Sequence, residues 1–147
     1  MTTAQEVFDY AIHLMDEQNE NTGETDTVDT AEYKYRTLSI LNVLRGELYP
    51  YSDTFKQRKE GKRPISTRIE DWESAIGLDD YICESILPYG LAAHLLMQEN
   101  PTSANFFQQR YDELKSLLQR GLPSVSEDIE DVYGDGSFEH NVYGYWA

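Results

Sequence analysis

The side chains best suited to chemistry in this 147-residue chain are one cysteine and three histidines. Cys83 lies in an apolar run directly before Glu84, whose carboxylate discourages the thiolate that a catalytic cysteine requires. His13, His94 and His140 are not at metal-ligand spacing from one another, and the Glu-x-x-His pairs of di-iron bundles do not occur. We therefore expect Cys83 to be structural and His94 to be a core or interface residue.

Two acidic segments attract attention as calcium sites, but neither fits one. Asp26 and Asp29 lack the spacing and the turn glycine of an EF-hand, and residues 131–136 match it no better. The chain also lacks the glycine-rich phosphate-binding patterns and the G-x-S-x-G elbow of serine hydrolases. The sequence predicts no catalytic residue, no metal ligand and no cofactor, so we expect a protein that is not an enzyme.

Positive charge is concentrated in residues 56–68, here called the basic segment. It contains a single acid, Glu60, and Phe55 is the only aromatic residue beside it, whereas nucleic-acid sites interleave cations with several aromatics. We expect the segment to contact protein, with a plain exposed loop as the alternative. Its candidate interaction residues are Lys56, Arg58, Lys59, Lys62, Arg63 and Arg68.

The formal net charge of −15 is distributed unevenly. Residues 1–32 hold nine acids and residues 122–147 hold six, with no lysine or arginine in either range, while residues 33–121 are neutral overall. A field of this sign repels phosphate backbones and argues against general nucleic-acid binding. The asymmetry indicates electrostatic association, between copies of this chain in particular, although solvated surface explains it equally well.

The remaining composition is that of one globular domain. Aromatic residues make up 12% of the chain, too many for a fully disordered protein, and a single cysteine excludes an intramolecular disulfide. The first 18 residues lack the basic start of a signal peptide, and the longest apolar run, residues 86–97, is too short to span a bilayer. We expect a soluble, intracellular, acidic protein.

Four segments carry apolar residues at helical spacing. In the first, Thr3 is the expected N-cap, Glu6 completes a capping box, and the pattern ends at Met15. In the second, Asp29 is the expected cap, and the helix stops near Pro50. The apolar stripe predicted for this second helix comprises Leu38, Leu41, Leu44 (or Arg45) and Leu48, widened by Ile40 and Val43.

The third segment, from about Asp79 to Asn100, is the most apolar, and we expect it to be the central helix with a kink at Pro88. Small residues at positions 90, 92 and 93 would let another backbone approach it. Asn100 and Pro101 open the fourth helix, and Gly121 closes it.

The connection between the second and third helices has two expected parts. Residues 51–68 form a loop or a short hairpin with Ile65 as its apolar anchor. Residues 69–76 form a short turn or extended segment that places Trp72 on the core and ends at Gly77.

Residues 122–147, here called the C-terminal arm, have no helical period. Their aromatics are too many for a purely solvating tail, so we expect an extended arm that docks on its own domain or on a neighbour. The candidate interaction residues in the arm are Tyr133, Phe138, Tyr143, Tyr145 and Trp146. The predicted fold is all-α: a bundle of about four main helices over residues 1–121, with the basic segment as an excursion and residues 122–147 as the arm.

Three runs within the third and fourth helices carry a resemblance. LPYGLAAHLL at residues 87–96, ENP at 99–101 and ANFFQQRY at 104–111 place an apolar helix, a short turn and a helix of the form A-x-F-x-x-x-Y in succession. This part of the chain resembles the head–tail connector (adaptor) proteins of tailed phages and prophages. The likeness covers about a third of the sequence.

The resemblance implies a virion structural protein, found in the virion or the bacterial host cytoplasm. It implies a subunit that assembles as a ring with copies of itself beneath the portal, contacts the portal or other head–tail proteins, and lets DNA pass without sequence-specific binding. It carries over no catalytic residue and no membrane contact. The alternatives are an acidic intracellular binding or inhibitory protein such as a DNA mimic, which would need acids spaced along a rod and not gathered at two ends, and a bacterial regulatory domain.

Overall fold

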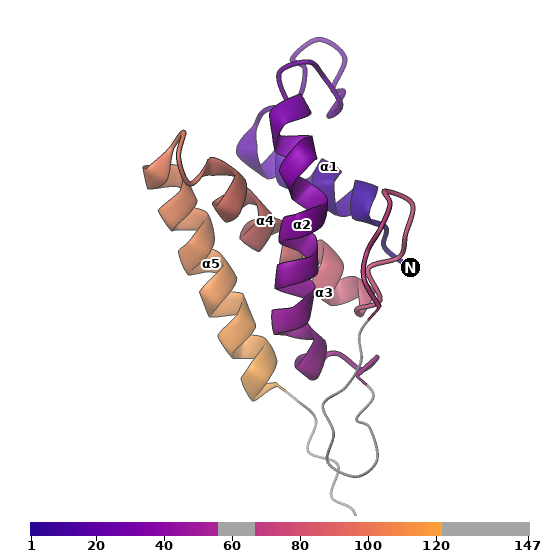
Figure 1. The fold of residues 1–147 in the computed structure, drawn as a ribbon. Coiled ribbons are helices and arrows are strands. Elements are labelled where there is room, and N and C mark those ends of the chain that lie inside the picture. The colour runs from indigo at the N-terminus through magenta and orange to yellow at the C-terminus, as the bar shows by residue number, and fades with distance from the viewer. Residues whose placement is uncertain (56–66, 122–147) are drawn as a thin grey trace, which may run out of the picture.

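The computed structural model describes residues 1–55 and 67–121. Within these ranges the regular elements are helices, joined by turns and one isolated bridge, so the predicted all-α class is confirmed (Figure 1). The helices are α1 (Ala4–Met15), α2 (Ala31–Leu48), the 3-10 turn η1 (Tyr49–Tyr51), α3 (Asp80–Ser85), α4 (Leu87–Leu96) and α5 (Pro101–Arg120).

The ends of α1 and α5 follow the predicted local chemistry. The Thr3 hydroxyl accepts a hydrogen bond from the backbone N–H of Glu6 at 3.3 Å, and the Asn100 side chain accepts one from the N–H of Ser103 at 3.2 Å. These bonds satisfy amides that the helices leave without an internal partner. Helix α5 ends at Gly121, as predicted.

The predicted start and stripe of α2 need correction. Asp29 does not cap the helix: Thr30 is the residue before it, and the Thr30 hydroxyl donates to the carbonyl of Thr25 at 2.6 Å. Val43 does not widen the buried stripe, because it is 60% exposed. The buried residues repeat every three or four positions, which leaves Val43 on the outer face; they are Tyr33, Thr37, Leu41, Leu44, Arg45 and Leu48.

The third predicted helix is two helices. A kink at Pro88 was expected, but the helix breaks at Ile86, whose backbone lies at φ −112° and ψ −52°, and α4 then starts with Pro88 in its first turn. Proline has no N–H to donate to the carbonyl four residues earlier, and its ring collides with that carbonyl, so the helical hydrogen bonding is interrupted in the turn before it. Helix α4 also ends earlier than predicted, at Leu96 and not near Asn100.

Helix α4 lies at the centre of the bundle and contacts α1, α2, α3 and α5 (Figure 1). The sequence predicted that another backbone would pack closely against its small residues. At Gly90, side chains from other helices approach instead. A Cβ atom at Gly90 would lie 2.9 Å from two ring atoms of Tyr111 and 3.1 Å from the Leu44 side chain. The helices α2, α4 and α5 therefore meet at this glycine.

Residues 67–79 pass beside the start of α1. This path places Trp72 against the core, as the sequence predicted. The N–H groups of Ala4 and Gln5 donate to the carbonyls of Ser74 and Trp72 at 3.1 and 3.0 Å, and the Trp72 ring packs edge-on against Phe8. The segment turns at Gly77, whose φ of +79° favours glycine. Among the described helices, none combines the length and the apolar character needed to cross a bilayer.

Candidate interaction site

Of the eleven predicted interaction residues, one lies in the described part of the chain. Arg68 is exposed, directly before the buried Ile69. The others lie outside the described residues; they are Lys56, Arg58, Lys59, Lys62 and Arg63 in the basic segment, and Tyr133, Phe138, Tyr143, Tyr145 and Trp146 in the arm.

The chain before the basic segment is fixed to the bundle by side chains. The Thr54 hydroxyl donates to the carbonyl of Gly77 at 2.6 Å, and the Asp79 carboxylate accepts from the N–H of Asp53 at 2.9 Å. The rings of Tyr49 and Phe55 pack edge to face with centroids 5.4 Å apart. The segment therefore departs from a fixed point at the C-terminal end of α2.

The chain after the basic segment is fixed by Asn42. Its side-chain oxygen accepts from the N–H of Ile69 at 2.8 Å, and its side-chain nitrogen donates to the carbonyl of the same residue at 3.0 Å. One amide thus satisfies both backbone groups of a buried residue, as a neighbouring strand would. Sequence reasoning missed this anchor, because an asparagine inside a helix gives no sign of its distant partner.

A polar hollow of about 400 Å³ lies beside Arg68. A second arginine, Arg45, reaches it from the buried face of α2, donates its Nε to the carbonyl of Ile76, and lies 5.3 Å from the Tyr49 ring centroid. Burial lowers the pKa of Arg45, and a Cβ at Gly77 would lie 2.7 Å from its guanidinium. The sequence offered this arginine only as an alternative to Leu44 in an apolar stripe.

The acidic loop, residues 16–30, lies at the other end of α2. Its six carboxylate side chains are all exposed, yet its backbone is held: the Asn19 side chain accepts from the N–H groups of Asn21 and Thr22, and Asp26 pairs with Lys34 at 2.9 Å. Partial desolvation by the surrounding protein, and after it the nearby carboxylates, raise the pKa of Glu17. The loop is a fixed concentration of like charge.

Helix α2 separates the acidic loop from the point where the chain enters the basic segment, while the Asn42 anchor lies along the helix between them. At 1.5 Å per residue its 18 residues span about 27 Å, and Figure 1 shows the loop at one end of the helix and the Tyr49–Ser52 turn at the other. The described bundle therefore carries its acidic loop at one end of α2, and the chain leaves for the basic segment at the opposite end.

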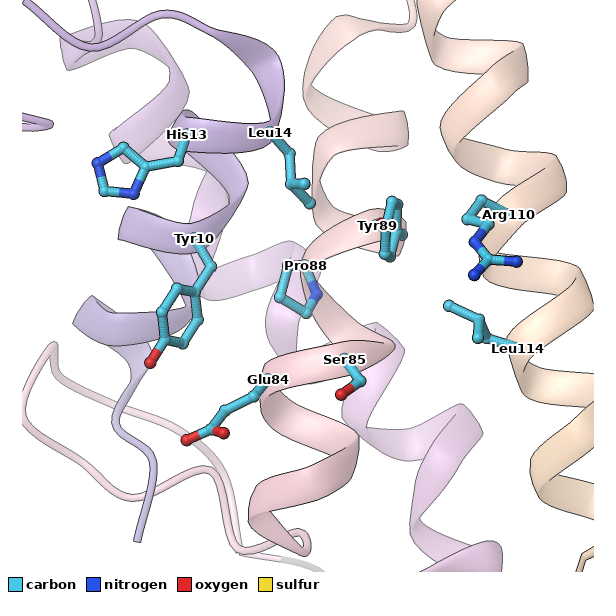
Figure 2. A pocket seen from close by; sticks show the side chains of 9 residues that line it. All are labelled: Tyr10, His13, Leu14, Glu84, Ser85, Pro88, Tyr89, Arg110 and Leu114. Atoms are coloured by element: carbon cyan, nitrogen blue, oxygen red, sulfur yellow. The ribbon is translucent and has the colours of Figure 1, made fainter.

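A second surface, here called the groove, escaped the sequence analysis. It has a volume of about 430 Å³ and lies between α1, the α3–α4 junction and α5 (Figure 2). The signal for it was present: Tyr10 and Leu14 lie four residues apart on α1, outside the apolar face that enters the core. The groove is lined by Tyr10, His13, Leu14, Glu84, Ser85, Pro88, Tyr89, Arg110 and Leu114.

The described surfaces do not have the composition of a metal centre. Within residues 1–55 and 67–121, no three His, Cys, Asp or Glu side chains lie close enough together to hold a metal ion. Comparison of the chain with protein-family models, with curated proteins and with solved structures gives no match. What the described surfaces offer is contact, through the charge of the acidic loop and through apolar side chains in the groove.

Proposed function

We propose that this chain is a structural subunit of a phage-type head–tail connector, which assembles head to tail into a ring beneath the portal. The observation that carries the proposal is that the acidic loop lies at the N-terminal end of α2, whereas the chain enters the basic segment at the C-terminal end. The resemblance of residues 87–111 to connector proteins supports the same function.

A ring built from identical subunits repeats one heterologous contact, so each subunit needs two different and complementary patches. An acidic loop and a basic segment of opposite charge meet this requirement and would orient one subunit against the next. A net charge of −15 would also keep DNA from adhering to the ring, because phosphates meet like charge on its surface.

Two charge-reversed variants test the contact. In the first, Lys59, Lys62 and Arg63 of the basic segment become glutamate. In the second, four exposed acids of the acidic loop become lysine, which spares the Asp26–Lys34 pair and turns the loop positive; the changes are Glu17→Lys, Glu20→Lys, Glu24→Lys and Asp29→Lys.

Each variant alone should assemble weakly, since its loop and its basic segment then carry charge of the same sign. An equimolar mixture should recover, because every contact in an alternating arrangement is again complementary. Sedimentation of the proteins with portal-containing heads measures assembly, and circular dichroism checks that each variant is folded. Wild-type assembly by both single variants would refute the polar contact.

Particles provide the direct test of the biological role. A prophage in the source strain is induced, the particles are purified, and this protein is quantified against the portal by mass spectrometry. We expect the two proteins in comparable numbers. Particles that contain portal and lack this protein would end the connector proposal and make an intracellular binding or inhibitory role, such as DNA mimicry, the leading one.

A further inference from the structure

The groove is an apolar surface that the described chain leaves uncovered. Tyr10 and Leu14 of α1 are each 37% exposed, and the wall opposite is formed by α5. In Figure 2, Leu14 from α1 and Leu114 from α5 lie on either side of Tyr89 and Pro88 of α4. Aromatic and proline surfaces of this kind favour an aromatic occupant.

The charges in the groove restrict what occupies it. Arg110 is the only lysine or arginine among the lining residues, and it pairs with Glu113 on the same helix at 3.3 Å. The other side is negative, because Glu84 lines it and the acids Glu6 and Asp9 lie on α1. Burial raises the pKa of Tyr10, and these three carboxylates raise it further. An occupant should therefore be mainly aromatic, with few acids.

One segment of this chain has that composition. Residues 138–146 contain four of the arm's five aromatics but a single acid, Glu139, with a histidine directly after it. The arm's other five acids all precede Phe138. The segment can thus offer aromatic rings to the groove and one carboxylate to Arg110 without bringing further negative charge beside Glu84.

The length of the arm suits the distance. Leu114 lies seven residues before Gly121, about 10 Å along α5, and α5 continues past the groove toward the start of the arm (Figure 2). Phe138 lies 17 positions after Gly121, and a flexible chain of that length has a root-mean-square span of about 21–25 Å. A linker of this span is long enough for residues 138–146 to meet the groove of their own chain, at an effective concentration in the millimolar range.

We propose that residues 138–146 dock in the groove of their own chain, with aromatic rings against Leu14, Tyr89 and Leu114. This inference is separate from the connector proposal, because it concerns the isolated protein and needs no ring. In the isolated protein, the arm then shields a surface that would otherwise be open to other proteins.

Photo-cross-linking of the full-length protein tests the docking. Tyr145 is replaced by p-benzoyl-phenylalanine, and the cross-linked peptides are identified by mass spectrometry in a mixture of ¹⁴N- and ¹⁵N-labelled protein. We expect cross-links within one chain to α1, α4 or α5 peptides that contain groove residues. The same probe at Tyr35, which is 86% exposed on α2, should not label them.

Matched variants then separate the groove from general effects. Leu14→Gln should lower the cross-link yield by about two- to fivefold, because it removes the exposed apolar surface of Leu14, about a third of the residue, from the contact with the arm. Arg110→Glu should lower it as well. The controls are Leu117→Gln and Arg120→Glu, which make the same changes on α5 outside the groove and should leave the yield unchanged.

Circular dichroism confirms that each variant is folded before its yield is compared. Cross-links to another face of the chain, cross-links only between differently labelled copies, or equal yields from groove and control variants would each overturn the proposal. The second of these outcomes would assign the groove to the arm of a neighbouring copy.

Discussion

Two glycines in helices give the sharpest test of the packing. Gly46 of α2 is exposed, and a Cβ atom built there meets nothing within 4 Å. Gly90 of α4 is buried, and a Cβ atom there would lie 2.9 Å from the Tyr111 ring. Both lie inside helices, so replacing either by alanine gives the same gain in helix propensity, about 0.8–1.0 kcal/mol.

The two variants should therefore change stability in opposite directions. Gly46→Ala should raise the free energy of unfolding by about 0.5–1 kcal/mol. Gly90→Ala adds the cost of overpacking a filled core, about 1–3 kcal/mol, and should lower it by about 1 kcal/mol net. Because the propensity gain cancels, the difference between the variants isolates the packing cost at Gly90.

Urea unfolding followed by far-ultraviolet circular dichroism measures both variants, with equal m-values as the condition for comparing them. A second pair in a Tyr111→Leu background identifies the cause, because a smaller side chain should relieve the clash and bring the variants closer together. Stabilities of Gly46→Ala and Gly90→Ala that agree within about 0.5 kcal/mol would refute the contact between α4 and α5 described above.

Three further predictions concern the ends of helices and one buried thiol. Asn100→Ala should lower the free energy of unfolding by about 1 kcal/mol through loss of the α5 cap, whereas Asn105→Ala, at an exposed position inside the same helix, should not lower it; thermal unfolding of both variants decides. Hydrogen bonds from the Thr2 side chain and backbone lower the pKa of Asp80 below its ordinary value of 3.8. Ionised Asp80 therefore stabilises the fold above that pH, and the contribution is lost as pH falls through the lowered pKa. Asp80→Asn should flatten the acid limb of a stability-against-pH curve, and an unchanged limb would exclude the contact. Burial raises the pKa of Cys83 to about 12, so Ellman's reagent should react with this single thiol only as the protein unfolds in urea, and rapid reaction in native buffer would contradict its burial.

Local signals were sufficient to predict most of the helices. The caps at Thr3 and Asn100 and the closing Gly121 act within four residues of their partners, so the sequence contains everything that they need. The break at Ile86 was harder. A proline disturbs a helix at a predictable place, but whether the helix bends or divides depends on how its neighbours pack.

Surfaces were predicted less well, because they depend on residues distant in sequence. Asn42 holds Ile69 across 27 positions, and nothing near either residue announces the pair. The groove collects side chains from four helices, of which only the α1 pair gave a local sign. Charge, by contrast, is additive along the chain, so the acidic loop was visible without a structure.

The groove and the core depend on one another through adjacent residues of α5. Tyr111 points inward, packs on Gly90 and donates its hydroxyl to Glu47 of α2 at 2.8 Å, while its neighbour Arg110 lines the groove. Consecutive residues of a helix are separated by about 100°, so a rotation of α5 that relieves Tyr111 must also turn Arg110. We expect the clash of a Cβ at Gly90 with Tyr111 to be relieved by such a rotation, so Gly90→Ala should alter the groove and reduce docking of the arm. The same change that measures packing in the core thus also tests whether the groove needs the geometry that the core imposes.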